Sequence, residues 1–347
     1  MSGEPPPASP PDRSLAYAVA AAIVLVLIAV LGGMGISRLT RAASPAIPSP
    51  SLVRSGLASP APTEPPSTEP FVFMQPLSAG CAAGDGVYVV SDGGGIGRFA
   101  FDRWQLIDPI ARSLVAATCQ GDVLTAVGGG GRVVAINDRD QTIRSDSVLL
   151  EDFLGVSTLG DGVLAVGRSG TVERQGGGGW GAYAAGIDED LFAVAAFGPS
   201  SAWAVGSGGV SYRLEPAGWR PVPTGVSVTL RAIAARSVDD ALVVGDDGVL
   251  LAWAGSWKLV AGAPTVSYRA ALFLGVVAYA AGDRGTLVRV SDPNGRPAVA
   301  VVDLGTTCTL RALFSRGDEL WVIGSDGGRA AVWRLAGGAV FHWGQCS

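Results

Sequence analysis

A glycine-centred pattern that recurs after residue 70 constrains the fold more than any other feature of the chain. In its clearest copy, the apolar run Ala241–Val244 precedes Gly245-Asp246-Asp247-Gly248, and a second apolar run follows and ends at Trp253. Gly and Asp tolerate the left-handed backbone of tight turns, so each copy predicts a strand, a turn and a strand. Seven positions carry the anchor residue of this turn: Ser91, Gly128, Gly167, Gly206, Gly245, Gly282 and Gly324.

Successive anchors are separated by roughly 40 residues, a period typical of a propeller blade. Helical repeats have similar periods, but they would show a 3.6-residue apolar periodicity that these segments lack. The fifth copy divides into four expected strands, Leu230–Ala234, Ala241–Gly245, Val249–Ala254 and Trp257–Val260. The fourth copy divides likewise into Phe192–Ala196, Ala202–Gly206, Val210–Leu214 and Trp219–Val222. Since such a sheet buries both faces only by stacking on its neighbours, the sequence predicts an all-β, seven-bladed β-propeller of four-stranded blades over residues 71–347.

Two side-chain patterns fit this architecture. The first strand of each copy is rich in small residues, as in Val194-Ala195-Ala196, which suits innermost strands that crowd a central channel. Four copies carry a tryptophan at nearly the same distance after the anchor, where the outermost strand begins: Trp104, Trp180, Trp219 and Trp257. We expect these rings to cap the grooves between blades.

Three segments precede the expected propeller. Residues 1–14 are rich in proline and serine and are expected to be disordered. Residues 15–36 form an uncharged apolar run that as a helix would span about 33 Å, enough to cross a bilayer. The alternative is a cleaved signal peptide, but the apolar part of such a peptide is ordinarily only about 7–15 residues long. Residues 37–70 are a Pro/Ser/Ala-rich linker. The sequence therefore predicts one N-terminal transmembrane helix that holds the propeller on a stalk.

The orientation of this helix involves a conflict. Only Arg13 precedes the apolar run, whereas Arg38, Arg41 and Arg54 follow it, so the positive-inside rule places the propeller in the cytoplasm. A long proline-rich stalk and a cysteine-bearing β-domain favour the opposite side. We therefore predict a single-pass membrane protein whose propeller is extracytoplasmic, on the periplasmic side.

Composition narrows the function. The net charge of −5 argues against nucleic-acid binding, which leaves a basic footprint. The chain has one histidine, His342, and four cysteines without a CxxC pair, so no metal site and no cofactor are expected. A catalytic triad would depend on His342 alone.

The residues Ala202–Val210, followed by Gly218-Trp219, resemble the BNR-type repeats of photosystem II assembly and stability factor-like propellers, which are WD40/YVTN-like. The segment from Leu230 to Gly248 has the same resemblance. The stricter Asp-box pattern, Ser/Thr-x-Asp-x-Gly-x-x-Trp, is matched only in part, as in Ser325–Gly328. The resemblance covers residues 74–347 and implies a propeller and an assembly role. Since one fold hosts many functions, it does not imply a particular partner.

Glycine-rich turns such as Gly128–Gly131 resemble phosphate loops, but a strand rather than a helix is expected to follow them. The acidic turns offer one or two carboxylates a blade, fewer oxygens than calcium requires, so turn propensity explains them better. These acidic turn residues are Asp92, Asp246, Asp247, Asp283 and Asp326.

Arg231, Arg269 and Arg311 occupy one repeat position in three consecutive copies, at nearly the same distance before the anchor. Propeller geometry would place them side by side at one mouth of the channel, as a patch that binds anions or carboxylates. The alternative is that each arginine pairs with an acid of its own blade, such as Asp239 or Asp240, or with carbonyl oxygens of that blade.

Cys81 and Cys119 are separated by almost one repeat, and Cys308 and Cys346 are separated by the same distance. Equivalent positions on neighbouring inner strands lie close together in a ring, so we predict the disulfides Cys81–Cys119 and Cys308–Cys346. They would require an oxidising compartment. The alternative is four buried thiols in a cytoplasmic domain.

We therefore predict a non-catalytic, membrane-anchored module that binds a protein, a peptide or a cell-envelope component. One alternative is a carbohydrate-active propeller that resembles a sialidase. That resemblance would imply an arginine cluster that binds a carboxylate and a tyrosine nucleophile with a glutamate partner. The tyrosines available are Tyr183, Tyr212 and Tyr268, and no blade glutamate occupies a recurring channel-facing position beside a tyrosine. The other alternative is a cytoplasm-facing scaffold.

Overall fold

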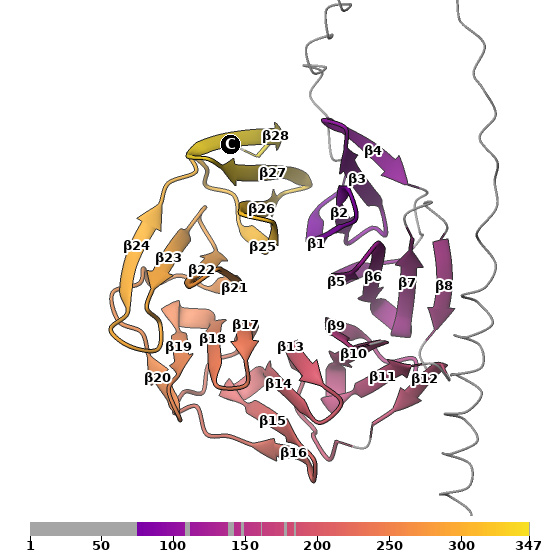
Figure 1. The fold of residues 1–347 in the computed structure, drawn as a ribbon, viewed down its shortest axis with the longest axis vertical. Helices are drawn as coiled ribbons and strands as arrows, with labels where there is room; N and C mark the ends of the chain where they lie inside the picture. Colours follow the sequence, from indigo (N-terminus) through magenta and orange to yellow (C-terminus); the bar gives the residue numbers. More distant parts are fainter. Residues whose placement is uncertain are drawn as a thin grey trace, which may run out of the picture. The chain divides into compact units, whose positions relative to one another are not determined.

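The computed structural model describes residues 75–107, 112–137, 142–146, 149–160, 162–176, 179–183 and 185–346. Within these ranges, 28 strands form seven four-stranded antiparallel sheets arranged as a wheel (Figure 1). The predicted tail, membrane helix and linker lie outside the described residues. No helix among the residues that are described has the length and apolar character to cross a membrane.

The four strands of each blade follow one another in the sequence, from the innermost strand to the outermost (Figure 1). Blades 1 to 4 consist of β1 Leu77–Ala83, β2 Gly86–Ser91, β3 Ile96–Ala100 and β4 Arg103–Ile107; β5 Leu114–Gln120, β6 Val123–Gly128, β7 Arg132–Ile136 and β8 Thr142–Asp146; β9 Phe153–Leu159, β10 Gly162–Gly167, β11 Val172–Gly176 and β12 Gly179–Ala182; β13 Leu191–Gly198, β14 Ser201–Gly206, β15 Ser211–Glu215 and β16 Gly218–Pro221. Blades 5 to 7 consist of β17 Leu230–Ser237, β18 Asp240–Gly245, β19 Leu250–Trp253 and β20 Trp257–Leu259; β21 Tyr268–Leu274, β22 Val277–Gly282, β23 Leu287–Ser291 and β24 Ala298–Val302; β25 Leu310–Arg316, β26 Glu319–Asp326, β27 Arg329–Ala336 and β28 Ala339–Gly344. The predicted seven-bladed, four-stranded architecture is therefore confirmed.

The ring closes where β25 of blade 7 contacts β1 of blade 1. Each described sheet contains only consecutive strands, so the first and last blades share no strand across this seam. Aromatic side chains join them instead: the ring centroid of Phe99 in β3 lies 5.5 Å from that of Trp321 in β26 and 5.0 Å from that of Trp343 in β28. Closure of the wheel therefore depends on side-chain packing between blades 1 and 7.

The tryptophans expected in the outermost strands all lie in their first two residues. Trp257 of blade 5 packs against Trp203 of blade 4, with ring centroids 5.1 Å apart. The indole N–H of the fully buried Trp203 donates to the carbonyl oxygen of Val238, 3.0 Å away. These rings fill the space between neighbouring blades, as predicted.

The anchor glycines allow the turn to touch the start of the inner strand. A Cβ at Gly245 would lie 2.4 Å from the carbonyl oxygen of Thr229, and one at Gly128 would lie 1.9 Å from that of Ser113. The next amide uses the same acceptor, since Asp246 N–H donates to the Thr229 oxygen at 2.9 Å. The turn is therefore held beside the first residue of the inner strand.

The two predicted disulfides are present in the structure. Cys81 of β1 is bonded to Cys119 of β5, and the pair joins the inner strands of blades 1 and 2 as expected. Cys308 is bonded to Cys346, but Cys308 lies between β24 and β25 and Cys346 follows β28. The expectation that the second pair also lies on neighbouring inner strands is wrong, because this bond ties the entry of blade 7 to its end.

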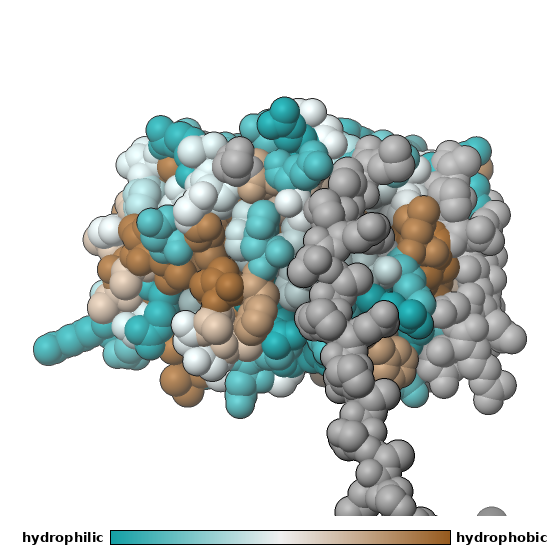
Figure 2. Space-filling view, turned by 90° about the horizontal axis from the view of Figure 1, so that it is seen from above, coloured by the Kyte–Doolittle hydropathy of each residue, from teal (hydrophilic) through white to brown (hydrophobic). Residues whose placement is uncertain are grey.

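Apolar side chains also reach the outside of the wheel. Figure 2 shows one side of it, where hydrophobic residues gather in patches among hydrophilic ones. Exposed examples on the outermost strands are Val301 of β24 and Val340 and Phe341 of β28. These positions lie on the outermost strands, far from the inner strands, so Val340 is a suitable control position.

Candidate functional site

Each inner strand carries a β-bulge at its second residue. In blade 5, Leu230 pairs with Gly245 and Ala232 pairs with Val244, so Arg231 is the extra residue. A bulge changes the direction in which its side chain points, and bulges are common beside functional sites. The same slip in register occurs in all seven blades, and the bulged residues are Ser78, Val115, Leu154, Phe192, Arg231, Arg269 and Arg311.

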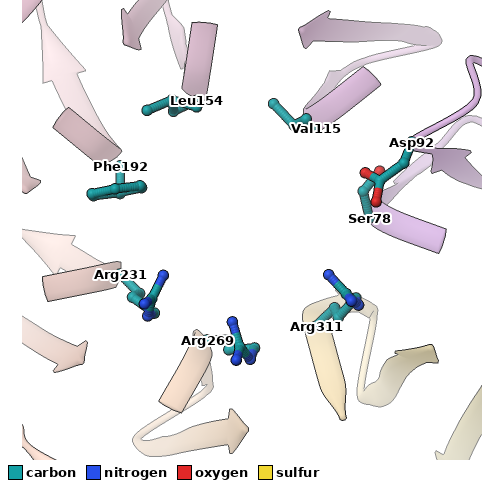
Figure 3. A pocket seen from close by; sticks show the side chains of 8 residues that line it. All are labelled: Ser78, Asp92, Val115, Leu154, Phe192, Arg231, Arg269 and Arg311. Atoms are coloured by element: carbon teal, nitrogen blue, oxygen red, sulfur yellow. The ribbon is translucent and has the colours of Figure 1, made fainter. Parts of the chain in front are cut away.

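These seven side chains and Asp92 line one cavity of about 240 Å³ at a mouth of the central channel (Figure 3). The three arginines predicted from their repeat position are therefore brought together. Small residues of the inner strands line the channel beside them, including Ala79, Gly80, Ala116 and Ala270. The expected small-residue hub is thus present.

The mouth has two chemically different arcs (Figure 3). Val115, Leu154 and Phe192 form an apolar arc on blades 2 to 4, and the three arginines form a cationic arc on blades 5 to 7. The arcs meet where the guanidinium carbon of Arg231 lies 5.9 Å from the centroid of the Phe192 ring. The cationic arc was predicted from the sequence, whereas the apolar arc was not, although its residues occupy the same repeat position.

Two of the arginines are paired within their own blades. Arg231 donates two hydrogen bonds to Asp246, with Nε to Oδ1 at 2.6 Å and a terminal nitrogen to Oδ2 at 2.8 Å. Arg269 donates in the same way to Asp283, at 2.6 and 3.2 Å. Each aspartate directly follows the anchor glycine, in the turn that is held beside the bulge. A bulged arginine and an aspartate after the anchor therefore form a bidentate pair.

The two acids named in the alternative, Asp239 and Asp240, do not pair with these arginines. Asp240 forms an ion pair with Arg236 at 2.5 Å, and Asp239 lies 3.5 Å from Arg213. Asp239 lies in the turn between β17 and β18, and Asp240 begins β18, at the opposite end of the inner strand from the bulge. Proximity in sequence suggested them, whereas the strand pairing places Asp246 beside Arg231.

Arg311 has no such partner. The residue after the blade 7 anchor is Ser325, whose N–H donates to the Thr309 oxygen at 2.9 Å, so the turn contacts the strand as in the other blades. Ser325 is only 1% exposed. Among the described residues, neither its hydroxyl nor Nε of Arg311 has a hydrogen-bond partner, and no ion pair involves Arg311.

Blade 1 shows the reverse arrangement. Asp92 follows the anchor position Ser91, but the bulged residue is Ser78, whose hydroxyl donates to the carbonyl oxygen of Leu114 at 2.5 Å. Asp92 is exposed and lies in the same cavity as Arg311. Across the seam, blade 7 thus contributes an arginine without its acid, and blade 1 contributes an acid without its arginine.

Replacing Arg231 with glutamine should lower the free energy of unfolding at pH 7 by about 1–2 kcal/mol, because it leaves a half-buried carboxylate without its charged donor. The Arg231 hydrogen bonds hold the pKa of Asp246 below its ordinary value, against burial, which raises it. The stability contributed by a lowered carboxyl pKa is present above the unfolded pKa and is lost as pH falls through the folded pKa. In urea denaturation, the free energies of unfolding of the variant and the wild type should therefore converge as the pH falls below the ordinary aspartate pKa of about 3.9.

Arg311→Gln is the matched control for this experiment, because it removes the same charge from a bulged residue that has no aspartate partner. We expect a change within about 0.5 kcal/mol. Equal losses for the two variants, or a difference that persists unchanged at low pH, would contradict the assigned pairing.

A tyrosine–glutamate pair joins β15 of blade 4 to the segment that precedes β13. The hydroxyl of Tyr212 donates to Oε2 of Glu189 at 2.9 Å. Burial, followed by the Glu189 hydrogen bond and charge, raises the pKa of Tyr212 to about 12. Neither residue lines the arginine-bearing cavity, and the raised pKa disfavours the phenolate that a nucleophile needs. The pair was missed from sequence because its members are 23 residues apart and in different structural elements.

The structure also places the remaining candidate groups, namely the glycine-rich turn, the possible metal ligands and His342. The Gly129–Gly131 turn leads into β7, so it lacks the helix N-terminus that a phosphate loop uses. Among the described residues, no three or more His, Cys, Asp or Glu side chains gather as metal ligands. His342 of β28 stacks on Trp333, with ring centroids 5.1 Å apart, and burial lowers its pKa.

No protein-family model and no curated protein matches this chain. Its fold is nevertheless similar to that of solved structures. The WD40 β-propeller domain of Doa1 matches with a TM-score of 0.61 and 12% identity, over 74% of this chain and 92% of that one. The RRP9 WD40 repeats match with a TM-score of 0.59 and 10% identity, over 73% and 88%.

PorZ, a bacterial surface component of the type-IX secretion system of Porphyromonas gingivalis, matches with a TM-score of 0.58 and 12% identity. The match covers 80% of this chain and 39% of PorZ. At such low identities the comparisons show the fold alone. The chain is therefore a seven-bladed β-propeller similar to WD40 propellers.

Proposed function

We propose that this chain is a membrane-anchored, non-catalytic β-propeller that binds a protein or peptide partner at the cell envelope through the mouth of its channel. The observation that carries the proposal is the ring of seven bulged residues, with one apolar and one cationic arc. Apolar contacts supply affinity and the guanidinium groups supply directional recognition. The likeness to propellers described as WD40 domains and as a secretion-system component is consistent with a binding role.

The resemblance of Ala202–Trp219 to BNR-type assembly-factor propellers extends this proposal to a role in building a membrane complex. In that role, residues 15–36 would anchor the chain and residues 37–70 would hold the propeller away from the bilayer. The two disulfides favour an oxidising compartment, on the periplasmic side.

In-cell photo-crosslinking tests the binding role directly. A photoreactive residue in place of Val115, in the apolar arc, should yield a discrete crosslinked product from native membranes. The same residue in place of Val340, on the outermost strand of blade 7, should not. Mass spectrometry of the product would identify the partner. Absence of a product at both Val115 and Phe192 would overturn the proposed use of the mouth.

A topology reporter fused after Ser347 tests the orientation. We expect activity from a reporter that works only outside the cytoplasm, such as an alkaline phosphatase, and no fluorescence from one that folds only inside. The opposite pattern would favour the cytoplasm-facing scaffold, in agreement with the arginines that follow the apolar run.

The Tyr212–Glu189 pair is the observation that favours the carbohydrate-active alternative. We expect no hydrolysis of chromogenic glycosides by the purified protein, because this pair lies outside the arginine-lined cavity. Hydrolysis that disappears in Tyr212→Phe would contradict the non-catalytic proposal.

A further inference from the structure

This inference rests on the proposed function and specifies the ligand of the same mouth. We propose that the mouth recognises a peptide carboxylate that lies next to an apolar side chain. Arg311 contacts the carboxylate, and Val115, Leu154 and Phe192 contact the apolar side chain. A C-terminal carboxylate and an acidic side chain share this chemistry, and the test below separates them.

Arg311 is the arginine available to an anion. Nε and one terminal nitrogen of Arg231 donate to Asp246, and the same two atoms of Arg269 donate to Asp283, so the charges of those arginines are largely offset. Nε of Arg311 is buried and has no hydrogen-bond partner among the described residues. Arg311 also lines the cavity, and among the described residues no carboxylate forms an ion pair with it, so its terminal N–H groups can receive an incoming carboxylate. Serine in place of aspartate at position 325 therefore leaves Arg311 free for a ligand.

The rest of the cavity limits what can accompany the anion. Its volume is about 240 Å³, and the seven bulged residues also line a second space of about 210 Å³ in the channel. The two spaces suit the end of a peptide or one side chain, and neither alone reaches the roughly 300 Å³ typical of sites for drug-sized molecules. Since Val115, Leu154 and Phe192 cannot donate hydrogen bonds, the group opposite the arginines is apolar.

Asp92 disfavours ligands that carry more than one negative charge. It lies in the same cavity as Arg311, on the neighbouring blade. Its carboxylate repels a second negative charge on the ligand, which disfavours a phosphate dianion relative to a carboxylate. It also offers an acceptor for a peptide N–H. Arg311 and Asp92 therefore act with opposite signs on anion affinity.

Fluorescence anisotropy with the full-length chain in detergent tests this recognition. Three labelled peptides ending in Ala-Leu or Ala-Phe serve as probes: one with a free C-terminal carboxylate, one amidated, and one amidated with an internal Glu beside the apolar residue. We expect binding of at least one carboxylate-bearing peptide, and binding at least tenfold weaker for the amidated peptide without Glu. A free-terminus preference identifies a chain end as the ligand, and a Glu preference identifies a side chain.

Substitutions at Arg311 and at Asp92 should shift the peptide affinity in opposite directions. Arg311→Gln should weaken binding of the preferred peptide at least tenfold, and Arg311→Lys should recover part of the loss because it restores the charge without the planar fork. Asp92→Asn should strengthen binding two- to fivefold and improve binding of a phosphorylated analogue more than that. Arg103→Gln removes one positive charge from the exposed outermost strand of blade 1 and should leave binding unchanged.

Equal effects of Arg311→Gln and Arg103→Gln, or equal binding of all three peptides, would overturn the inference. These results are distinguishable from failure of the proposed function. If the Val115 crosslink forms and the carboxylate peptides do not bind, the mouth contacts a partner through other chemistry. If neither occurs, both proposals are wrong.

Discussion

Trp321→Ala should lower the free energy of unfolding by about 3–5 kcal/mol, the largest effect that we expect from a single substitution. Trp321 of β26 is fully buried. Its ring stacks between Phe314 and Trp343 of the same blade, with centroids 5.9 and 5.8 Å away, and also contacts Phe99 of blade 1. Because blades 1 and 7 share no strand, the cavity left by this ring weakens the packing that closes the wheel.

Urea denaturation followed by far-UV circular dichroism would measure the loss, with Val340→Ala as the control. Val340 lies in the same blade but is 53% exposed, so its truncation should change the free energy by no more than about 0.5 kcal/mol. Opening of the seam before global unfolding would appear as a second transition or a lower m-value. A Trp321→Ala loss below about 1 kcal/mol would show that closure does not depend on this aromatic cluster.

Replacing both Cys308 and Cys346 with alanine should lower the free energy of unfolding by roughly 4 kcal/mol in the chain-entropy account, since the two cysteines have a sequence separation of 38. The bond closes a loop that contains all of blade 7. Without it, β28 is held only by its pairing with β27 and by side-chain packing. We therefore expect faster hydrogen exchange in β28 as well as a lower midpoint of denaturation.

The Cys81–Cys119 pair is a matched control, because its sequence separation is also 38. Loop entropy alone predicts the same loss of stability for its double alanine variant. It does not predict faster exchange in β28, because this bond joins inner strands of blades 1 and 2. Losses below about 1 kcal/mol for both variants, or faster exchange in β28 in both, would contradict the role assigned to the Cys308–Cys346 bond.

The sequence by itself determined the number of blades, the four strands of each blade and the order of those strands from the innermost to the outermost. These features are local: short apolar runs, turn residues that tolerate positive φ, and a period of about 40 residues each identify an element without knowledge of its neighbours. Asp247, with a φ of 57°, lies in the left-handed conformation that its turn requires. The first disulfide followed from the same periodicity, because one repeat separates equivalent positions on adjacent inner strands.

Tertiary structure alone decided how the mouth is built. A bulge is a slip in hydrogen-bond register, and register depends on pairing between strands rather than on composition. That slip directs the Phe192 and Arg231 side chains into one cavity and places Asp246, rather than Asp239, against Arg231. The residue after the anchor is an aspartate in blades 5 and 6 and Ser325 in blade 7, so the sequence already contained this difference. Only the folded blade shows that the residue at this position faces the bulge. The sequence specified the repeated unit, and non-local packing decided which side chains of different repeats meet.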